Sequence, residues 1–416
     1  MATTTAFTRA DVAALDARDP LASMRDQFHV PEGVVYLDGN SLGALPKVTQ
    51  QRINEVIAQE WGTGLIRSWN TAGWYEMPRR IGDNIARLIG ARAGEVVVAD
   101  STSVNTFKVL AAALRLRPKR TKIVSEPDNF PTDLYMAQGL IEMLGGKHEL
   151  VLRYAGELPT AIDKQTAVVL LTHANYRTGY LHDMAAITEY IHAQGALVIW
   201  DLAHSAGAMP VDLTGANADF AIGCGYKYLN GGPGAPAFVY VAKRHQRKFS
   251  QPLSGWLGHQ QPFAFDWQYE PAKGIARYLC GTQPVLSMAA LECGVDLMLT
   301  VDLAQVRAKS QAMADLFWQL IEQQCSTHGL ELVTPRDATQ RGSQICLRHP
   351  EGYAIMQALI AQGVIGDFRA PDILRFGFTP LYLRYVDVWD AVATLAQTLD
   401  RRGWDKPKFK RKAKVT

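Results

Sequence analysis

The chain has 416 residues, of which 48% are hydrophobic and 20% are charged, so it can bury a large core and is neither a disordered nor a fibrous protein. Its length suggests two or three domains. The 43 lysines and arginines exceed the 40 acidic residues by only three, which is too little charge to indicate nucleic acid as a partner.

Short apolar runs that are typical of buried strands alternate with longer helical patterns through the first three hundred residues. The predicted strands cover residues 34–37, 95–99, 122–124, 168–172, 196–200 and 218–222, and the predicted helices between them cover 78–89, 104–114, 132–144 and 184–194. This alternation predicts an α/β fold in which a large domain, residues 61–289, has a mostly parallel central sheet flanked by helices. Because ligands bind beyond the carboxyl ends of such strands, the residues after each run are the candidates for a functional site.

The pattern changes after Pro284. Long helical patterns at 286–299 and 304–324 precede short strands at 330–333, 343–347 and 373–376 and helices at 353–361 and 386–399. These segments predict a smaller α+β domain built from both chain ends, residues 1–60 and 290–405. The last residues, 406–416, contain six basic side chains and no acidic one, so we expect a disordered, solubilising tail.

The cysteines and the N-terminal residues indicate the cellular compartment of the protein. The five cysteines are widely spaced and include no Cys-x-x-Cys pair, which indicates neither a disulfide framework nor a zinc site. Residues 1–24 lack the apolar core of a signal peptide, and no segment approaches the roughly 18 apolar residues that span a bilayer. The sequence therefore predicts a cytoplasmic protein with no membrane partner, no nucleic-acid partner and no metal.

Common phosphate-binding and hydrolase signatures are absent from the sequence. No P-loop pattern occurs, and Gly223-x-Gly225 lacks the third glycine of the dinucleotide motif because Tyr228 occupies its position. Neither a Gly-x-Ser-x-Gly turn nor a His-Glu-x-x-His helix is present. Residues 197–234 remain as the strongest candidate segment.

Two charged residues in this segment stand at the ends of neighbouring predicted strands. Asp201 ends an apolar run, where a buried carboxylate requires a cation or strong hydrogen-bond donors. Lys227 follows the next strand, between Tyr226 and Tyr228, so both charges should lie at one edge of the sheet. Pyridoxal 5'-phosphate (PLP) requires such a pair, because a lysine holds its aldehyde as a Schiff base and a carboxylate keeps its ring nitrogen protonated. A helix cap at Asp201 and a surface loop at Lys227 are the alternatives.

Three further segments fit a PLP site, each with a structural alternative. Residues 101–103, Ser-Thr-Ser, lie between a predicted strand and a helix, where a bound phosphate and an ordinary helix cap use the same residues. Phe130 and Asp133 follow another strand and offer an aromatic face and a carboxylate, or else a turn with a buried Phe. Arg375 interrupts an apolar strand of the second domain, where a substrate carboxylate or a structural ion pair would neutralise it.

The sequence resembles the kynureninase family in five motifs, which are Leu37-Asp38-Gly39-Asn40-Ser41-Leu42-Gly43, Phe130-Pro131-Thr132-Asp133, Asp201-Leu202-Ala203-His204, Tyr226-Lys227-Tyr228-Leu229-Asn230 and Gly255-Trp256-Leu257-Gly258-His259. That family consists of PLP-dependent enzymes of the aspartate-aminotransferase fold, type I. The similarity runs from about residue 36 to residue 399. It implies a homodimer that hydrolyses L-kynurenine, or 3-hydroxy-L-kynurenine, to anthranilate, or 3-hydroxyanthranilate, and L-alanine in tryptophan breakdown.

The resemblance also implies roles for individual residues. Lys227 would hold the cofactor and move the α-proton, Asp201 would hold the ring nitrogen, and Phe130 would stack on the ring. The phosphate would be bound by Thr102, Ser103 and Tyr226 and, from the neighbouring subunit, by Trp256 and Thr282. The cofactor shell would be completed by Asp133, Thr172 and His204. Arg375 would clamp the substrate carboxylate, and Trp69, with Trp74 as the alternative, would lie against the substrate ring.

The reaction requires an acid–base group in addition to Lys227. Cleavage of the Cβ–Cγ bond needs proton transfer at the γ-carbon, whereas Lys227 serves Cα. Tyr226 is the candidate, because a phenol near the phosphate can relay protons if its normally high pKa is lowered.

A cysteine desulfurase, which shares the fold and the cofactor, is the main alternative. It requires a reactive cysteine on a mobile loop, but the corresponding stretch here, residues 368–372, contains neither Cys nor His, and Cys346 lies in an apolar run. A second alternative is an interaction protein that has kept the fold without the chemistry. The joint presence of Lys227, Asp201 and Arg375 argues against it, because no structural need requires all three.

Overall fold

The computed structural model describes residues 6–248 and 251–412, which form two compact units. The larger unit comprises Val48–Tyr176 and His182–Thr300, and the smaller unit comprises Met1–Lys47, Arg177–Leu181 and Val301–Thr416.

The boundaries between the units differ from those that the sequence predicted at residues 60 and 290. Helix α9 (Val285–Met298) packs against α4 (Met77–Leu88), and the π-helical segment Val56–Gly64 packs against α9. Both segments therefore belong to the larger unit. The sequence assigned part of α9 to the smaller domain because its apolar pattern resembles that of the next helix, α10 (Leu303–Gln324).

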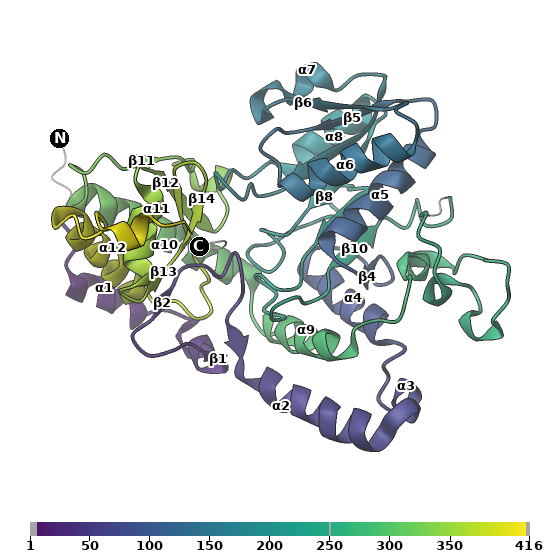
Figure 1. Cartoon of the computed structure of the whole chain (residues 1–416), viewed down its shortest axis with the longest axis horizontal. Helices are drawn as coiled ribbons and strands as arrows, with labels where there is room; N and C mark the ends of the chain where they lie inside the picture. The colour runs from purple at the N-terminus through teal and green to yellow at the C-terminus, as the bar shows by residue number, and fades with distance from the viewer. Residues whose placement is uncertain (1–5, 249–250, 413–416) are drawn as a thin grey trace. The chain divides into compact units, whose positions relative to one another are not determined.

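The larger unit is built on a seven-stranded sheet (Figure 1). Its strands, in spatial order, are β4 (Val96–Val98), β10 (Phe238–Val241), β9 (Phe220–Gly223), β8 (Leu197–Asp201), β7 (Thr166–Thr172), β5 (Lys122–Ser125) and β6 (Glu149–Leu152). The strands from β9 to β6 run parallel, and β10 runs antiparallel to both of its neighbours. The predicted mostly parallel sheet is confirmed.

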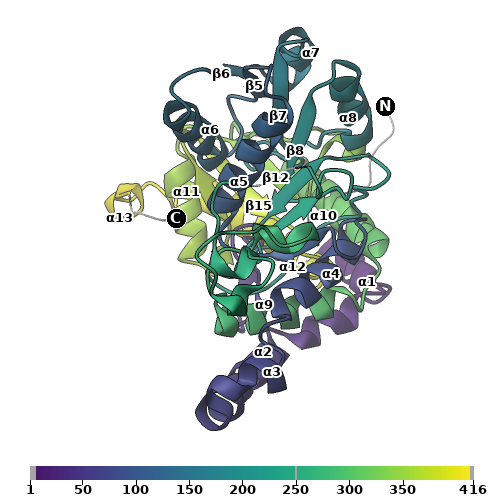
Figure 2. The same ribbon diagram turned by 90° about the vertical axis from the view of Figure 1, so that its right-hand side faces the viewer.

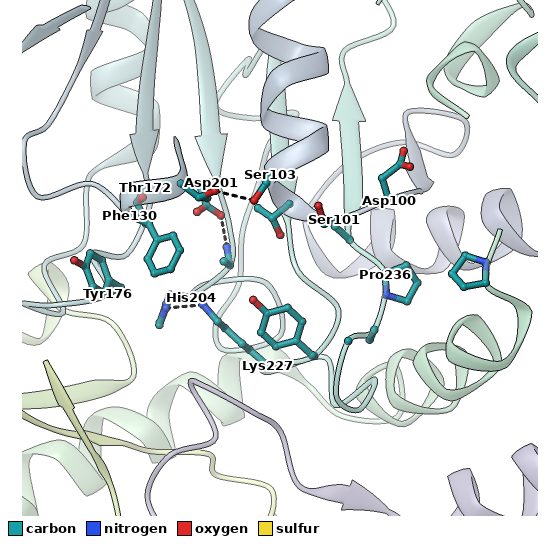
Figure 3. A pocket seen from close by; sticks show the side chains of 18 residues that line it. Asp100, Ser101, Ser103, Phe130, Thr172, Tyr176, Asp201, His204, Lys227 and Pro236 are labelled. Carbon is teal, nitrogen blue, oxygen red and sulfur yellow. Dashed lines mark hydrogen bonds between the residues drawn. The ribbon is translucent and has the colours of Figure 1, made fainter. Parts of the chain in front are cut away.

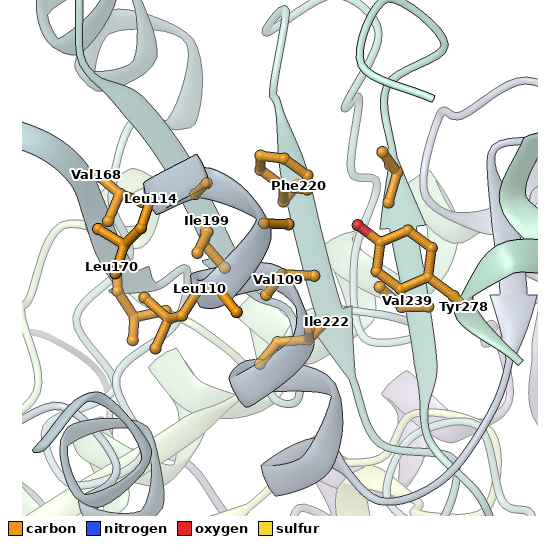
Figure 4. Close-up of a cluster of buried hydrophobic side chains, with 14 of the residues drawn as sticks. Val109, Leu110, Leu114, Val168, Leu170, Ile199, Phe220, Ile222, Val239 and Tyr278 are labelled. Carbon is orange, nitrogen blue, oxygen red and sulfur yellow. The ribbon is translucent and has the colours of Figure 1, made fainter. Parts of the chain in front are cut away.

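The centre of this sheet is fully buried. Every residue of β7 and β8 is buried, which explains why these strands show unbroken apolar runs in the sequence. Alternate residues of neighbouring strands meet helix α5 (Thr102–Leu116) in the core drawn in Figure 4, which includes Val168, Leu170, Ile199, Phe220, Ile222 and Val239 of the sheet and Val109, Leu110 and Leu114 of the helix. Burial of one such side chain contributes about 1.5–3 kcal/mol, so this core fixes the strand ends firmly.

The strand directions bring several chain segments to one edge of the sheet. Because β10 reverses direction between β4 and β9, β4 again runs parallel to the other strands. The carboxyl ends of β4, β5, β7, β8 and β9 therefore lie at one edge, together with the amino end of β10. This is the edge at which the sequence placed its candidate residues.

Helices start close to these strand ends. Helix α5 follows β4, α6 (Pro131–Met143) follows β5, and α8 (Met184–Ala193) follows β7. Ser101 caps α5 by accepting a hydrogen bond from the Val104 N–H (3.3 Å). The predicted helices at 78–89, 104–114, 132–144 and 184–194 are confirmed, with ends that differ by one or two residues. The shorter helices of this unit are α3 (Ser68–Thr71) and α7 (Leu158–Ala161), and α2 (Lys47–Glu55) begins at the unit boundary.

The smaller unit has a four-stranded antiparallel sheet in the order β11 (Glu331–Leu332), β12 (Gln344–Arg348), β15 (Ile373–Gly377) and β14 (Asp367–Arg369). Its main helices are α1 (Arg9–Asp16), α10 (Leu303–Gln324), α11 (Gly352–Ile360) and α12 (Tyr385–Asp400), of which α10 and α12 are also visible in Figure 2. Two further strand pairs are β1 (Phe28–His29) with β3 (Leu45–Pro46) and β2 (Val35–Tyr36) with β13 (Val364–Ile365). The predicted strand at 34–37 thus belongs to this unit and not to the large sheet.

The basic end of the chain has local structure where the sequence predicted disorder. Helix α13 (Pro407–Lys410) packs against α11. Lys410 pairs with Asp405 and lies over the Trp404 ring, 5.6 Å from its centroid, so one acidic and one aromatic neighbour order this stretch. The rest of the predicted tail, residues 413–416, lies outside the described residues.

The described part of the chain contains neither a membrane-spanning helix nor a metal-binding cluster. Within residues 6–248 and 251–412, no helix is long and apolar enough to cross a membrane. The same residues contain no group of three or more His, Cys, Asp or Glu side chains arranged to hold a metal ion.

Candidate active site

A cavity of about 450 Å³ opens at the edge of the large sheet where the strand ends meet (Figure 3). Eight of the predicted site residues line it: Thr102, Ser103, Phe130, Thr172, Asp201, His204, Tyr226 and Lys227. They come from the segments that follow β4, β5, β7, β8 and β9. Residues that are far apart in the sequence thus form one site, as the strand-end argument predicted.

Lys227 is the cation of this cavity. Its Nζ lies 2.9 Å from His204 Nε2, 5.8 Å from the centroid of the Phe130 ring and 5.9 Å from that of Tyr226 (Figure 3). Its side chain is held between an imidazole and two aromatic rings rather than extended into solvent. The alternative of a surface loop lysine is therefore wrong.

Two buried carboxylates lie behind the lysine. Burial raises the pKa of Asp201, although the charge of Lys227 and the N–H of Ala203, which donates to Asp201 Oδ1 at 2.8 Å, both oppose the shift. Burial and the charge of Asp201 raise the pKa of Asp133 well above its usual range. Asp133 Oδ1 accepts a hydrogen bond from Thr106 (3.1 Å), whereas its Oδ2 has no partner among the described residues. Asp133 does not line the cavity, so its predicted place in the cofactor shell stays a prediction.

Tyr226 differs from what its predicted acid–base role requires. Burial is the main cause that raises the pKa of its phenol, and the neighbouring Cys224 and Asp201 act in the same direction. The hypothesis that Tyr226 relays protons required a lowered pKa. The protein around Tyr226 therefore favours a neutral phenol that donates a hydrogen bond, and does not favour a phenolate base.

The segment at the start of α5 contains the helix cap that the sequence offered as one of two interpretations. Ser101 is the helix cap, while Thr102 and Ser103 line the cavity, and Ser103 Oγ lies 2.7 Å from Thr132 Oγ1. The start of a long helix presents N–H groups that favour an anion. Ser101 is thus the cap, and the binding of a phosphate by Thr102 and Ser103 stays a prediction.

A buried lysine holds this turn from behind. Lys108, on the second turn of α5, is fully buried; its Nζ pairs with Asp100, and donates to the Tyr278 carbonyl at 2.6 Å. Asp100 has a positive φ of 48° and lines the cavity. Sequence reasoning missed Asp100, although it stands directly after a predicted strand, which is the signal that located Asp201. Lys108 gave no such signal, because only its contacts in space identify its role.

Besides Asp133, three predicted residues of the larger unit lie outside this cavity. Trp69, in α3, is half-buried and packs edge-on against Trp74, with ring centroids 6.2 Å apart. Trp74 is buried and donates its indole N–H to Glu60 (2.6 Å). Trp256, in the short helix Trp256–Gly258, and Thr282 are exposed in the single chain. The roles of Trp69, Trp256 and Thr282 stay predictions.

Arg375 lies on β15 in the smaller unit and is fully buried. Its Nε donates to Asp367 Oδ1 at 2.8 Å, its Nη2 pairs with Asp367 Oδ2, and Nη2 also donates to Ser41 Oγ at 2.6 Å. Asp38 Oδ1 lies 3.8 Å from Nη2, and burial together with the charge of Asp367 raises the pKa of Asp38 to about 7. The structural ion pair that the sequence left as an alternative is thus present, and the binding of a substrate carboxylate by Arg375 stays a prediction.

The cysteine that a desulfurase would need is not reactive in this structure. Cys346, on β12, is fully buried, and burial raises its pKa to about 11. A thiol nucleophile requires the opposite shift and access to solvent. The geometry therefore disfavours the desulfurase alternative.

Solved structures of cysteine desulfurases and of a C-DES protein linked to PLP share this fold. The cysteine desulfurase of Thermococcus onnurineus NA1 superposes with a TM-score of 0.76 at 19% identity and covers 91% of this chain and 98% of its own. The cysteine desulfurase CsdA of Escherichia coli gives 0.77 at 19% identity, with 92% and 98% covered. A C-DES mutant with glycine linked to its PLP cofactor also gives 0.77, at 18% identity, with 89% and 98% covered. At these identities the likeness shows the fold alone, which is the predicted fold type.

Sequence comparison separates this chain from those desulfurases. A family model described as the kynureninase C-terminal domain matches residues 306–395. The kynureninase of Burkholderia pseudomallei (strain 1106a) is 59% identical over 414 residues, which cover 98% of this chain and 100% of that protein. The kynureninase of Pseudomonas fluorescens is 58% identical with the same coverage. Identity at this level over nearly every residue, from the cavity of the larger unit to the helices of the smaller one, places the chain in the kynureninase family.

Proposed function

We propose that the protein binds PLP in this cavity and hydrolyses L-kynurenine to anthranilate and L-alanine. One water is consumed, the Cβ–Cγ bond breaks, the hydroxyl of the water goes to the carbonyl carbon, and a proton goes to Cβ. The 3-hydroxy form of the substrate would give 3-hydroxyanthranilate in the same way. The observation that carries the proposal is the meeting of Lys227 and Asp201 in one cavity of a chain from the kynureninase family.

The side chains of the cavity fit PLP in their chemistry. Asp133 has a buried oxygen without a partner, and burial raises the pKa of both Asp133 and Asp201. Two such carboxylates behind one lysine indicate that a further positive group belongs in front of them, and a protonated pyridine nitrogen supplies it. Thr102 and Ser103, at the start of α5, line the same cavity and suit a phosphate.

The assignments of the cofactor-binding residues follow from this arrangement. Asp201, supported by Asp133, would hold the proton on the ring nitrogen, Phe130 would face the ring, and Lys227 would hold the aldehyde. Thr102, Ser103 and Tyr226 would bind the phosphate. PLP supplies an electron sink that makes the α-proton of an amino acid removable.

The residues of the chain then divide the proton transfers. Lys227 Nζ is the group that moves the proton at Cα, and His204, 2.9 Å away, fixes its position. Burial raises the pKa of Tyr226, which favours its neutral phenol as a hydrogen-bond donor over a phenolate base. The remaining proton, which leaves the attacking water and arrives at Cβ, would be relayed through a water molecule hydrogen-bonded to Tyr226.

Release of anthranilate tests the proposal directly. The purified protein, loaded with PLP, is incubated with L-kynurenine, and the fluorescence of anthranilate is followed while L-alanine is measured in the same sample. We expect the two products in equal amounts and a dependence on added PLP after dialysis against a PLP scavenger. A protein that binds PLP and releases neither product, or that releases sulfide from L-cysteine, would contradict the proposal.

A homodimer that shares its active sites is the second part of the proposal. Four aromatic side chains of one segment are exposed, Trp256 at 37%, Phe263 at 59%, Phe265 at 77% and Trp267 at 94%. The Phe263 ring packs against the rings of Trp256 and Phe265, with centroids 5.6 and 6.3 Å apart, so these three side chains form one apolar patch. Patches of this kind on a soluble domain mark a protein interface, and a second copy is the partner that would bring Trp256 to a phosphate.

Mixed dimers test the sharing of sites. Lys227→Ala and Trp256→Ala chains are each expected to show little activity alone. If Trp256 completes the neighbour's site, random mixing of the two chains places one intact site in every hybrid and restores about a quarter of the wild-type activity. If Trp256 acts within its own chain, no mixture regains activity, and shared sites are excluded.

A reducing compartment fits the cysteines. All five are free, and four of them are buried, so none is paired within the chain. We include a cytoplasmic location in the proposal on this basis.

A further inference from the structure

Asn129 lies at the centre of a buried hydrogen-bond chain in the cavity wall. It stands between β5 and α6, next to Phe130, and only 2% of its surface is exposed. Its Nδ2 donates to Ser125 Oγ at 3.0 Å and to the Leu170 carbonyl at 3.4 Å. Its Oδ1 accepts from the Phe130 N–H at 2.7 Å and from the Thr172 hydroxyl. The side chain thus connects two cavity residues, Phe130 and Thr172, to the sheet.

The orientation of the Asn129 amide is fixed by its backbone partners. The Phe130 N–H can only donate, and the Leu170 carbonyl can only accept. In a flipped amide, the Asn129 NH2 group would face the Phe130 N–H, and the Asn129 oxygen would face the Leu170 carbonyl oxygen. Both contacts would be repulsive. The Ser125 hydroxyl supports this orientation, because it donates its own proton to the Leu170 carbonyl (2.7 Å) and so accepts from Asn129.

This orientation determines what Thr172 offers to the cavity. The Asn129 Oδ1 carries no hydrogen, so the Thr172 hydroxyl must donate to it. The proton of that hydroxyl is therefore directed into the wall, and its lone pairs remain on the cavity side. Figure 3 shows Thr172 and Phe130 on the same side of the cavity as Asp201.

We propose that Asn129 is a positioning residue that holds Thr172 as a hydrogen-bond acceptor and Phe130 at a fixed angle, so that the cavity selects a cofactor with a protonated group facing Thr172. The inference rests on the proposed PLP site. It concerns a residue that touches neither cofactor nor substrate and acts through its two neighbours. An O–H or N–H of the bound cofactor is the complementary chemistry, and an anionic oxygen at the same point is disfavoured.

Removal of the amide separates this role from a purely structural one. Asn129→Ala frees the Thr172 hydroxyl to rotate and donate, and leaves the Phe130 N–H without its partner. We expect the dissociation constant of PLP to be about tenfold higher for the variant than for the wild type, since one or two hydrogen bonds of about 1 kcal/mol each are affected. The pH midpoint of the absorbance change of the bound cofactor should fall by roughly one unit, because a donating hydroxyl favours the deprotonated group.

Four companion variants make the result decisive. Asn129→Asp retains an oxygen that accepts from Phe130 and Thr172, so its pH midpoint should not fall. Thr172→Val removes the acceptor, and the double variant Asn129→Ala/Thr172→Val should bind PLP no more than about threefold worse than Thr172→Val, because the two residues act as one unit. Ser125→Ala removes a partner on the far side of Asn129 and should lower the melting temperature of the cofactor-free protein without changing PLP affinity.

Two results would overturn the inference. One is an Asn129→Ala protein with unchanged PLP affinity and an unchanged pH midpoint. The other is a double variant whose loss equals the product of the single losses, which would indicate independent, structural effects. If Asn129→Ala does not fold, the comparison of Asn129→Asp with Thr172→Val decides in the same way, since only the latter should lower the midpoint. Failure of the wild-type protein to bind PLP would instead contradict the proposed function.

Discussion

Replacement of Lys227 by alanine is expected to reduce kcat/KM for L-kynurenine by at least about 10³-fold, because one amine both holds the cofactor and moves the α-proton. The surrounding structure should survive, since Lys227 is only half-buried and its neighbour Phe130 is held by its own hydrogen bond to Asn129. The measurement is steady-state release of anthranilate. Reduction with borohydride, which traps a lysine–aldehyde linkage, should attach PLP to the wild-type protein and not to the variant.

A second lysine of the same sheet provides the control. Lys122 begins β5 at the opposite edge and pairs with Asp163 at 2.6 Å. Lys122→Ala should lose a little stability and retain its activity. Small amines added to the Lys227→Ala protein should restore part of the rate if the lysine moves a proton. Activity of Lys227→Ala within tenfold of wild type would assign the chemistry to another group.

Replacement of Asp201 by asparagine is expected to lower kcat/KM by about 10²–10³-fold, because a neutral amide cannot hold a proton on the ring nitrogen. The Asn oxygen can still accept from the Ala203 N–H, so the local structure should remain. Burial raises the pKa of Asp201, and burial together with the charge of Asp201 raises that of Asp133, so ionisation of these carboxyls is unfavourable in the folded protein. The cofactor-free variant should therefore unfold at the same or a higher temperature while it loses activity.

Asp219 is a buried aspartate directly before β9, and its pKa is shifted in the opposite direction to that of Asp201. Although burial opposes it, the hydrogen bonds of His192 and His245 at 2.8 and 2.7 Å lower the pKa of Asp219. A lowered pKa means that this carboxylate stabilises the fold at neutral pH and that the stability is lost as pH falls below the unfolded-state pKa of about 4. Asp219→Asn should therefore lower the melting temperature at pH 7, with a smaller effect near pH 3, and retain catalysis. If Asp201→Asn behaved like Asp219→Asn, Asp201 would have a structural role only.

The sequence predicted the parts of this fold that depend on continuous burial. Strands β7 and β8 lie in the centre of the sheet, where both faces are apolar, and their positions follow directly from the residue pattern. Strand β10 is equally buried but was not predicted, and nothing in Phe238–Val241 indicates that it runs antiparallel. Strand β6 is half-exposed at the sheet edge, so its pattern is weak.

In the site, too, the sequence predicted residues from their position after a strand and missed roles that depend on contacts between distant residues. Asp201 and Lys227 were found because each follows a strand, and strand ends meet in a parallel sheet. Asn129 directly precedes the recognised motif Phe130-Pro131-Thr132-Asp133, yet its role depends on Thr172, 43 residues further along the chain. The pairing of Arg375 with Asp367 could not be read either, because two short strands must first pair in register. The direction of the Tyr226 pKa depends on burial, which a sequence does not show.

The cavity also has a consequence for the lifetime of the protein in a cell. Its walls come from residues 100 to 284, so a bound molecule contacts segments along nearly the whole larger unit. A ligand present at a hundred times its dissociation constant stabilises the folded state by about 2.7 kcal/mol through mass action. Chains made during a shortage of vitamin B6 would lack this stabilisation, open more often and be degraded sooner. The supply of the vitamin would then set the amount of the protein as well as the fraction that is active.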